Sequence, residues 1–433
     1  MQLTPFDHPN SYRNHWNTAE VTTRIQDGIE KHRKSDARVQ VIGADGRPMP
    51  GAKLTVRQLN SSFHFGANIF KLGGFKSEEL NHAYETSFLK LFNGATVPFY
   101  WKTLEVEQDH PRFTTNSVRI DRRPPPDFVV DFCQRNGLRM HGHTLSWASK
   151  NWSIPEWLPL DPDETDRLVD KRIREIAERY GNVIKRWDVL NEADAGYAPE
   201  EVHPMSDNYE AKAFQAASRY FADDVRLDIN ETTGYWYPHK KAYLHQIQRL
   251  LDQGCDIGAV GLQFHIMTDE EMYRLSLGER FAPQQLFATL DQYAKFNLPI
   301  HISEITLTAP ENSPEGLALQ ADAARNFYRL WFSHPAVEGI TWWNVPDGGA
   351  APGEDTVYSG LLYEDLTPKP SYHALQQLIH EEWRTEVSGI TDAKGCFEFR
   401  GFHGEYHIDV PGYAVQKNMH LSPDTTTDIT ITH

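Results

Sequence analysis

Two glutamates lie at or next to the ends of apolar segments that are typical of buried strands. Segment 184–191, IKRWDVLN, is followed at once by Glu192, so an amide and a carboxylate stand side by side at Asn191-Glu192. Segment 299–307, PIHISEITL, carries Glu304. Cleavage of an acetal needs one protonated carboxyl group for the leaving oxygen and one ionised carboxylate for the charge that develops at the anomeric carbon. Two such groups in one site would suit glycoside hydrolysis, with Asn191 donating to a neighbouring sugar hydroxyl.

Other side chains suited to sugar binding lie at the ends of further expected strands. They are His141, His143 and Trp147 in LRMHGHTLSW, Gln263 and His265 in AVGLQFHI, and Trp342, Trp343 and Asp347 in GITWWNVPD. Singly, a strand histidine is more often structural and a tryptophan more often part of the core. Their coincidence at one end of several strands favours a shared site. None of these residues has the close spacing on one helix that is typical of metal ligands, so we expect no metal and no cofactor.

The elements that must position these residues alternate along the chain. Eight apolar segments are separated by amphipathic stretches such as 163–181 and 240–254, both of which end at glycine as helices commonly do. The segments are 63–70, 94–99, 138–145, 184–191, 225–230, 259–266, 299–307 and 339–345. This repeat predicts a (β/α)8 TIM barrel over 61–384, whose active site lies at the C-terminal ends of the strands. An open doubly wound sheet is the alternative, but no glycine-rich nucleotide fingerprint follows the first segment.

The flanks of the predicted barrel are rich in β-strand patterns. Residues 37–59 alternate in polarity around turn residues, which indicates a hairpin, and 385–433 also combine alternation with glycine turns. Neither flank is long enough for a comfortable core of its own. We therefore expect 23–60 and 385–433 to pair into one small β-sandwich beside the barrel, with two separate decorations as the alternative. Residues 1–22 form a polar and aromatic extension of undefined role.

Composition limits the classes of partner. The formal net charge of −17 argues against nucleic acid or an anionic membrane surface, and no stretch approaches the apolar length of a membrane span. Aromatic residues make up 12% of the chain, which slightly favours a carbohydrate substrate. The first residues show no basic start followed by an apolar run, so we expect no signal peptide in this chain. That leaves a cytoplasmic protein and a mature secreted form both open.

Five motifs in the same order resemble those of glycoside hydrolase family 10, the xylanase family. They are HGHTLSW, WDVLNEA, GLQFH, HISEITL and TWWNVPD, within residues 60–382. The resemblance implies a retaining mechanism on β-glycosides, with Glu192 as general acid/base and Glu304 as nucleophile. It also implies a set of substrate-binding residues: Asn191, His143, Trp147, Gln263, His265, Trp343 and Trp101.

Three regions depart from the pattern of that family. After the second strand, Val97, Phe99 and Tyr100 occupy the stretch where the family carries polar residues that hold the sugar on the non-reducing side. Ala148 stands where a second histidine is usual, and Thr306 stands where an aspartate usually supports the sixth-strand histidine. The catalytic pair is thus retained while the residues that choose the sugar are changed, and fewer polar donors would penalise xylan.

We therefore expect a retaining glycoside hydrolase acting on β-glycosidic bonds of a polysaccharide or glycoside, with endo-β-1,4-xylanase activity as the default. A non-xylan glycan and a glycoside with an apolar aglycone are the alternatives within this class. A carbohydrate-binding protein that no longer catalyses is the alternative from another class. The sugar, the linkage, the choice between exo and endo action, and the oligomeric state stay open.

Overall fold

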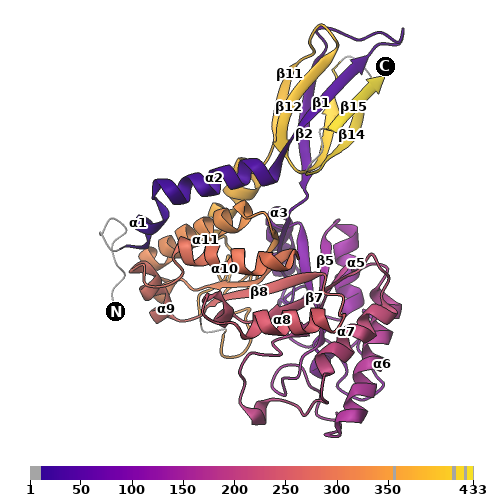
Figure 1. Cartoon of the computed structure of the whole chain (residues 1–433), viewed down its shortest axis with the longest axis vertical. Coiled ribbons are helices and arrows are strands. Elements are labelled where there is room, and N and C mark those ends of the chain that lie inside the picture. The colour runs from indigo at the N-terminus through magenta and orange to yellow at the C-terminus, as the bar shows by residue number, and fades with distance from the viewer. Residues whose placement is uncertain (1–10, 355–356, 412–415, 424–426, 433) are drawn as a thin grey trace.

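A closed barrel of eight parallel strands forms the centre of the protein (Figure 1). The computed structural model describes residues 11–354, 357–411, 416–423 and 427–432. Around the barrel the strand order is β10-β3-β4-β5-β6-β7-β8-β9. The strands are β3 (His64–Asn68), β4 (Gly94–Pro98), β5 (Arg139–Ser146), β6 (Arg186–Asn191), β7 (Arg226–Glu231), β8 (Ala259–Ile266), β9 (Ile300–Leu307) and β10 (Val337–Trp342). Every strand expected from the sequence is present, so the (β/α)8 barrel is confirmed.

Helices cover the outside of the barrel. They are α3 (Glu78–Leu91), α4 (Trp101–Leu104), α5 (Pro126–Arg135), α6 (Pro162–Tyr180), α7 (Tyr209–Tyr220), α8 (Ala242–Asp252), α9 (Asp269–Ser276), α10 (Pro283–Tyr293), α11 (Pro314–Ser333) and α12 (Pro370–Gln377). Short 3₁₀-helical turns are η1 (Pro199–Glu201), η2 (Thr233–Trp236), η3 (Ala294–Phe296) and η4 (Pro310–Asn312), and η5 (Leu378–Glu382) is a π-helical turn that follows α12. Helix α6 begins where the Asp161 side chain accepts from Glu164 N, with Pro162 in its first turn, and ends at Gly181. No helix among the described residues has both the length and the apolar character needed to cross a membrane.

The two flanks form a β-sandwich, as expected from the sequence (Figure 1). One sheet has the order β12-β1-β15 and the other the order β11-β2-β13-β14. The strands are β1 (Lys34–Ile42), β2 (Lys53–Ser61), β11 (Glu386–Ile390), β12 (Cys396–Phe402), β13 (Gly404–Asp409), β14 (Gln416–Leu421) and β15 (Thr427–Thr432). Val39, Val56, Tyr406 and Leu421 are all fully buried in the core between the sheets.

The hairpin expected at 37–59 is wrong. Strand β1 pairs with β12 and β15, whereas β2 pairs with β11 and β13, so the two strands belong to opposite sheets. Both strands alternate because each turns one face to the shared core, and alternation alone does not identify the partner. In addition, residues 19–33 form a helix, α2 (Ala19–Arg33), which follows the short α1 (Tyr12–Trp16) and crosses the boundary expected between extension and flank.

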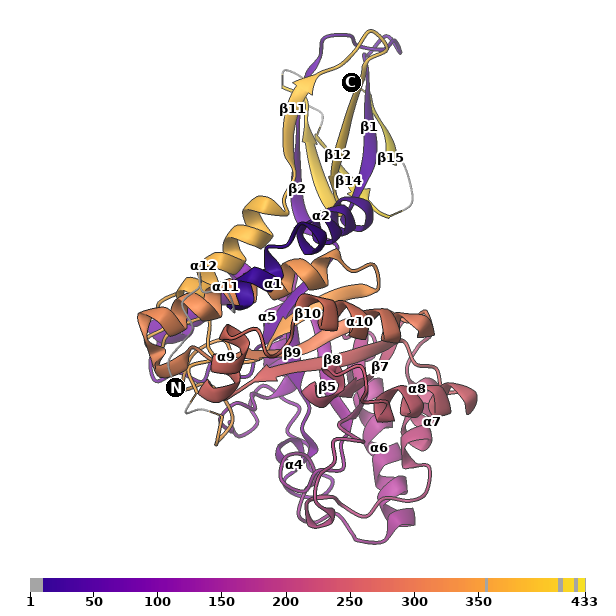
Figure 2. The same ribbon diagram turned by 60° about the vertical axis from the view of Figure 1, so that its left-hand side comes forward.

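The sandwich stands at the end of the barrel where the strands begin (Figure 2). Strand β2 ends at Ser61 and the first barrel strand starts at His64, so the chain passes directly from one to the other. Arg33, at the end of α2, donates to the carbonyls of Phe332 and Val337, both at 2.5–2.6 Å. Phe332 also stacks on Trp383, with ring centroids 4.1 Å apart. The opposite end of the barrel is therefore free of the sandwich.

Removing the Tyr406 ring should destabilise the sandwich. The side chain is fully buried and its hydroxyl donates to Phe402 O at 2.5 Å. We expect Tyr406→Ala to lower the free energy of unfolding by about 3–5 kcal/mol, because it leaves a cavity between the sheets. The control is Ile390→Ala, whose side chain is 63% exposed, with an expected change within about 0.5 kcal/mol. Denaturant unfolding followed by circular dichroism measures both, and equal effects would contradict the prediction.

Candidate active site

The two glutamates singled out in the sequence share one hydrogen-bond donor. Glu192 follows β6, Glu304 lies in β9, and Gln263 lies in β8. Gln263 Nε2 donates to Glu192 Oε1 at 2.8 Å and to Glu304 Oε1 at 3.1 Å. The two carboxylate oxygens are therefore no farther apart than the sum of these distances. The structure brings Glu192, Glu304 and Gln263 together at the C-terminal end of the barrel.

Glu304 is the more deeply buried carboxyl group. It is 4% exposed, and its carboxylate also accepts from Asn230 Nδ2 at 3.0 Å and lies 3.3 Å from His265 Nε2. Burial raises the pKa of Glu304 to about 8; the charge of His143 opposes the rise and that of Glu192 adds to it. A carboxyl group in this environment favours its protonated form at neutral pH.

Glu192 lies at the start of the loop after β6 and is only half-buried. Its Oε2 accepts from the Tyr197 hydroxyl, which belongs to the same loop. The loop is held by Glu231, whose buried carboxyl group accepts a hydrogen bond from Asp194 N at 2.6 Å. Burial raises the pKa of Glu231 to about 8. Tyr197 and Glu231 were not among the residues predicted from the sequence.

Asn191 presents an unused donor beside the carboxyl pair. Its Oδ1 accepts from Asn230 Nδ2 at 2.8 Å, which fixes the orientation of the amide. Its Nδ2 is buried and has no hydrogen-bond partner among the described residues. Asn230 is itself oriented by Ser303, whose hydroxyl donates to Asn230 Oδ1 at 2.6 Å. The sequence analysis did not predict Asn230 as a site residue. Its position at the end of the expected strand 225–230 could have indicated it.

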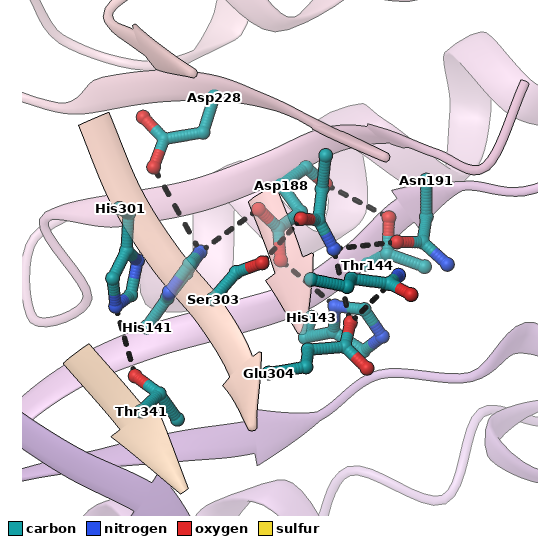
Figure 3. A network of polar contacts seen from close by, with 12 residues as sticks. His141, His143, Thr144, Asp188, Asn191, Asp228, His301, Ser303, Glu304 and Thr341 are labelled. Carbon is teal, nitrogen blue, oxygen red and sulfur yellow. Dashed lines mark hydrogen bonds and ion pairs between the residues drawn. The ribbon is translucent and has the colours of Figure 1, made fainter. Parts of the chain in front are cut away.

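His143 is held by a carboxylate deeper in the barrel (Figure 3). Its Nδ1 is hydrogen-bonded to Asp188 Oδ2 at 2.8 Å, and His141 Nε2 lies 3.1 Å from Asp188 Oδ1. Although burial opposes it, the two histidines hold the pKa of Asp188 well below its usual range. An ionised Asp188 fixes the ring of His143, which Figure 3 shows next to Glu304.

Within the described part of the chain, one group of side chains has the spacing of metal ligands. His141, Asp228 and His301 place one potential ligand atom each within 4.8 Å of the others, and all three are buried. Asp228 already accepts a hydrogen bond from Arg186, and His301 Nε2 is hydrogen-bonded to Thr341 at 2.8 Å. The three side chains therefore fit a network of ion pairs and hydrogen bonds inside the barrel, which Figure 3 shows together with Glu304.

An aromatic cluster lies beside His143. Its buried members are Phe70, Tyr100, Trp147 and Trp343. The rings of Tyr100 and Trp343 each lie 5.3 Å from that of His143, and Trp147 lies 5.9 Å from Tyr100. The structure thus places Trp147, Trp343 and His143 together. The indole N–H of Trp147 is buried without a partner among the described residues, so it can donate to a bound molecule.

Trp101 is not brought into this cluster. It lies in the first turn of α4, its Nε1 donates to Glu105 Oε2 at 2.7 Å, and its ring packs edge-on against Trp157. Its side chain belongs to the main hydrophobic core. The neighbouring Tyr100 supplies the aromatic face at the site instead, because the helix begins between the two residues and turns Trp101 away.

His265 has a neutral partner. Its Nδ1 is hydrogen-bonded to Thr306 Oγ1 at 2.8 Å, while Nε2 faces Glu304. Burial lowers the pKa of His265. A hydroxyl group gives an imidazolium far less stabilisation than a carboxylate would. His265 therefore stays neutral and adds no positive charge that would favour the ionised form of Glu304.

Known proteins with similar sequences and folds include xylanases. The chain is 27% identical over 390 residues to anti-sigma-I factor RsgI6 of Acetivibrio thermocellus, which covers 88% of this chain and 45% of that protein. It is 23% identical over 387 residues to endo-1,4-beta-xylanase 2 of Arabidopsis thaliana, which covers 87% of this chain and 32% of that protein. The chain thus spans less than half the length of either relative.

The fold also matches solved structures. The crystal structure of native xylanase 10B from Thermotoga maritima superposes with a TM-score of 0.61 at 23% identity, covering 74% of this chain and 96% of that one. The sequence model of glycosyl hydrolase family 10 matches residues 75–378, which is more than half of the chain. With its eight-stranded barrel, the chain belongs to glycosyl hydrolase family 10.

Proposed function

We propose that this protein is a retaining glycoside hydrolase, and the observation that carries the proposal is the Gln263 amide shared by Glu192 and Glu304. The sum of its two hydrogen-bond lengths is below the separation of about 6.5–9.5 Å that leaves room for a water in inverting enzymes. It is compatible with the separation of about 5–5.5 Å that is typical of retaining enzymes. The geometry therefore supports direct attack by one carboxylate on the sugar.

In the first step Glu304 attacks the anomeric carbon, and Glu192 protonates the departing oxygen. The bond from the anomeric carbon to that oxygen breaks as the bond to Glu304 forms, which gives a covalent glycosyl-enzyme. In the second step Glu192 takes a proton from water, and the hydroxide displaces Glu304. The half-buried position of Glu192 suits proton exchange with solvent, whereas the burial of Glu304 suits contact with the sugar ring.

The pair must hold one proton between its two carboxyl groups. Burial favours the neutral form of Glu304. As positive charge develops at an anomeric carbon beside it, the ionised form becomes favourable, and the proton belongs to Glu192. The free Nδ2 of Asn191 is placed to donate to the adjacent sugar hydroxyl, a bond that strengthens in the transition state.

Similarity to a protein named endo-1,4-beta-xylanase 2 supports a xylan-like β-1,4-glycan as the substrate. The aromatic faces of Tyr100, Trp147 and Trp343 suit the apolar faces of sugar rings. Val97 and Phe99 are buried in the main hydrophobic core, and Tyr100 is the residue of this stretch that belongs to the aromatic cluster, so fewer sugar hydroxyls would be paired beside the second strand. We therefore propose an endo-xylanase-like enzyme whose preferred glycan differs from plain xylan in that region.

Removal of either carboxylate should separate the two roles. We expect Glu304→Ala to abolish turnover, and Glu192→Ala to slow substrates with poor leaving groups about 10²–10⁴-fold while sparing activated aryl glycosides. Glu175→Gln, a half-buried change on α6, is the matched control and should leave kcat/KM unchanged. An activated fluoro-sugar should trap an adduct on Glu304, detected by mass spectrometry. Binding of glycans without adduct or turnover would instead indicate a non-catalytic binding protein.

Activity should depend on pH with a basic limb set by the shared proton. Because the pKa of Glu304 is raised to about 8, the pair keeps a proton below that pH and loses it above. We therefore expect kcat/KM to fall tenfold per pH unit above about pH 8, because no acid remains for the leaving group. The profile is measured on an aryl xyloside of poor leaving-group ability. A rate that stays constant to pH 10 would contradict this assignment.

A carboxylate placed beside His265 should shift the basic limb of the pH profile of kcat/KM. In Thr306→Asp the new charge would favour the imidazolium, whose positive charge near Glu304 Oε2 would lower the pKa of Glu304. We expect the basic limb to shift to lower pH by about one unit. Thr306→Asn has nearly the same shape without the charge and should leave the limb in place. Equal shifts in both variants would show that size rather than charge is responsible.

A further inference from the structure

Arg123 presents an open edge of its guanidinium group next to the aromatic cluster. The guanidinium lies 3.7 Å from the ring centroid of Tyr100 and 5.2 Å from that of Phe70. Its Nη1 donates to the carbonyl of Arg122 at 2.9 Å, and neither Nε nor Nη2 is hydrogen-bonded to any described residue. Stacking on Tyr100 fixes the plane of the group and leaves the Nε and Nη2 hydrogens, which share one edge, available to donate.

Arg122 adds a second positive charge that has no ion-pair partner among residues 11–354 or the other described ranges. It is 6% exposed and is held by Gly349 O at 2.8 Å and Asn344 Oδ1 at 3.3 Å, both neutral acceptors. The neighbouring Asp121 pairs with Lys71 instead, at 2.7 Å. Two adjacent arginines are thus left without a bonded carboxylate, although the protein carries a net charge of −17.

The arginine pair and the carboxyl pair act on the same phenol. Burial raises the pKa of Tyr100; the charges of Arg123 and Arg122 oppose the rise, whereas those of Glu304 and Glu192 add to it. The ring of Tyr100 contacts the Arg123 guanidinium at 3.7 Å and lies 5.3 Å from the ring of His143. This is the region after the second barrel strand, where the polar residues expected for holding a neutral sugar are absent.

We propose that Arg123, supported by Arg122, binds the carboxylate of an acidic sugar adjacent to the reacting one, either a uronic acid in the chain or a uronate side group. The proposal rests on the glycosidase function proposed above and names its substrate class. An open Nε–Nη2 edge matches the two oxygens of a carboxylate, and such charge-assisted pairs are about twice as strong as neutral hydrogen bonds. Because the acidic protein as a whole repels anionic glycans, a local positive site is needed to hold one.

Glu354 is a carboxylate that could compete for the two arginines. Its charge acts on both arginines and on His265, yet it forms no ion pair with them. Its Oε2 is buried without a hydrogen-bond partner among the described residues. Glu354→Gln should therefore strengthen binding of an acidic sugar, because it removes the opposing charge.

The test compares one glucuronoxylo-oligosaccharide with the same molecule after reduction of its carboxyl group to an alcohol. Binding of both is measured by calorimetry on the full chain, and kcat/KM is measured alongside. We expect the acidic form to bind at least about tenfold tighter, with a preference that falls as salt rises. Equal affinities would overturn the proposal. Absence of turnover on both, with the binding preference intact, would instead count against the proposed glycosidase function alone.

Substitutions test whether Arg123 causes the preference for the acidic oligosaccharide over its reduced form. Arg123→Gln should bring the affinity ratio close to one, and Arg123→Lys should keep only part of it, because a lysine retains the charge but loses the planar fork. Arg119→Gln is the matched control on the same loop: its guanidinium donates to Gly73 O and stacks on Phe128, so the ratio should be retained. An unchanged ratio in Arg123→Gln, or an equal loss in Arg119→Gln, would contradict the assignment.

Discussion

The side-chain amide of Gln263 holds two carboxyl groups close enough that both cannot be ionised without strong repulsion. This constraint is built by the order of the barrel. Glu192 directly follows β6, and Asn230, Gln263 and Glu304 lie in β7, β8 and β9, so the four residues come from consecutive neighbours in the barrel. Each strand end contributes one polar group, and the hydrogen bonds run sideways from strand to strand. The position of every one of these groups therefore depends on the register of the parallel sheet.

The part of this arrangement that local sequence determines was predictable. Long apolar segments ending in polar residues locate the strands, and the closure of the barrel brings their ends together. Glu192 and Glu304 could thus be paired although they lie 112 positions apart in the numbering. The same logic placed Gln263, His265 and His143, because each lies on a strand whose direction fixes where its side chain points.

The remainder depends on contacts that the local pattern does not encode. Tyr197 reaches Glu192 only because of the path of a loop, which Glu231 fixes through a backbone N–H. Tyr100 and Trp101 are adjacent and both aromatic, and the start of α4 decides which of them faces the site. The strand partners in the sandwich were missed for a similar reason, since alternation defines a buried face but not the strand that lies beside it.

The pairing of β1 with β12 and β15 has a consequence for the chain during synthesis and folding. The N-terminal strands β1 and β2 are synthesised first, yet their partners come from the last residues of the sequence. Until the barrel between them has formed, both strands have unpaired edges, which are templates for aggregation. Once it has closed, bringing the flanks together costs far less entropy than joining the ends of a free chain. Closure of the barrel therefore favours assembly of the sandwich, which couples the stability of the two parts.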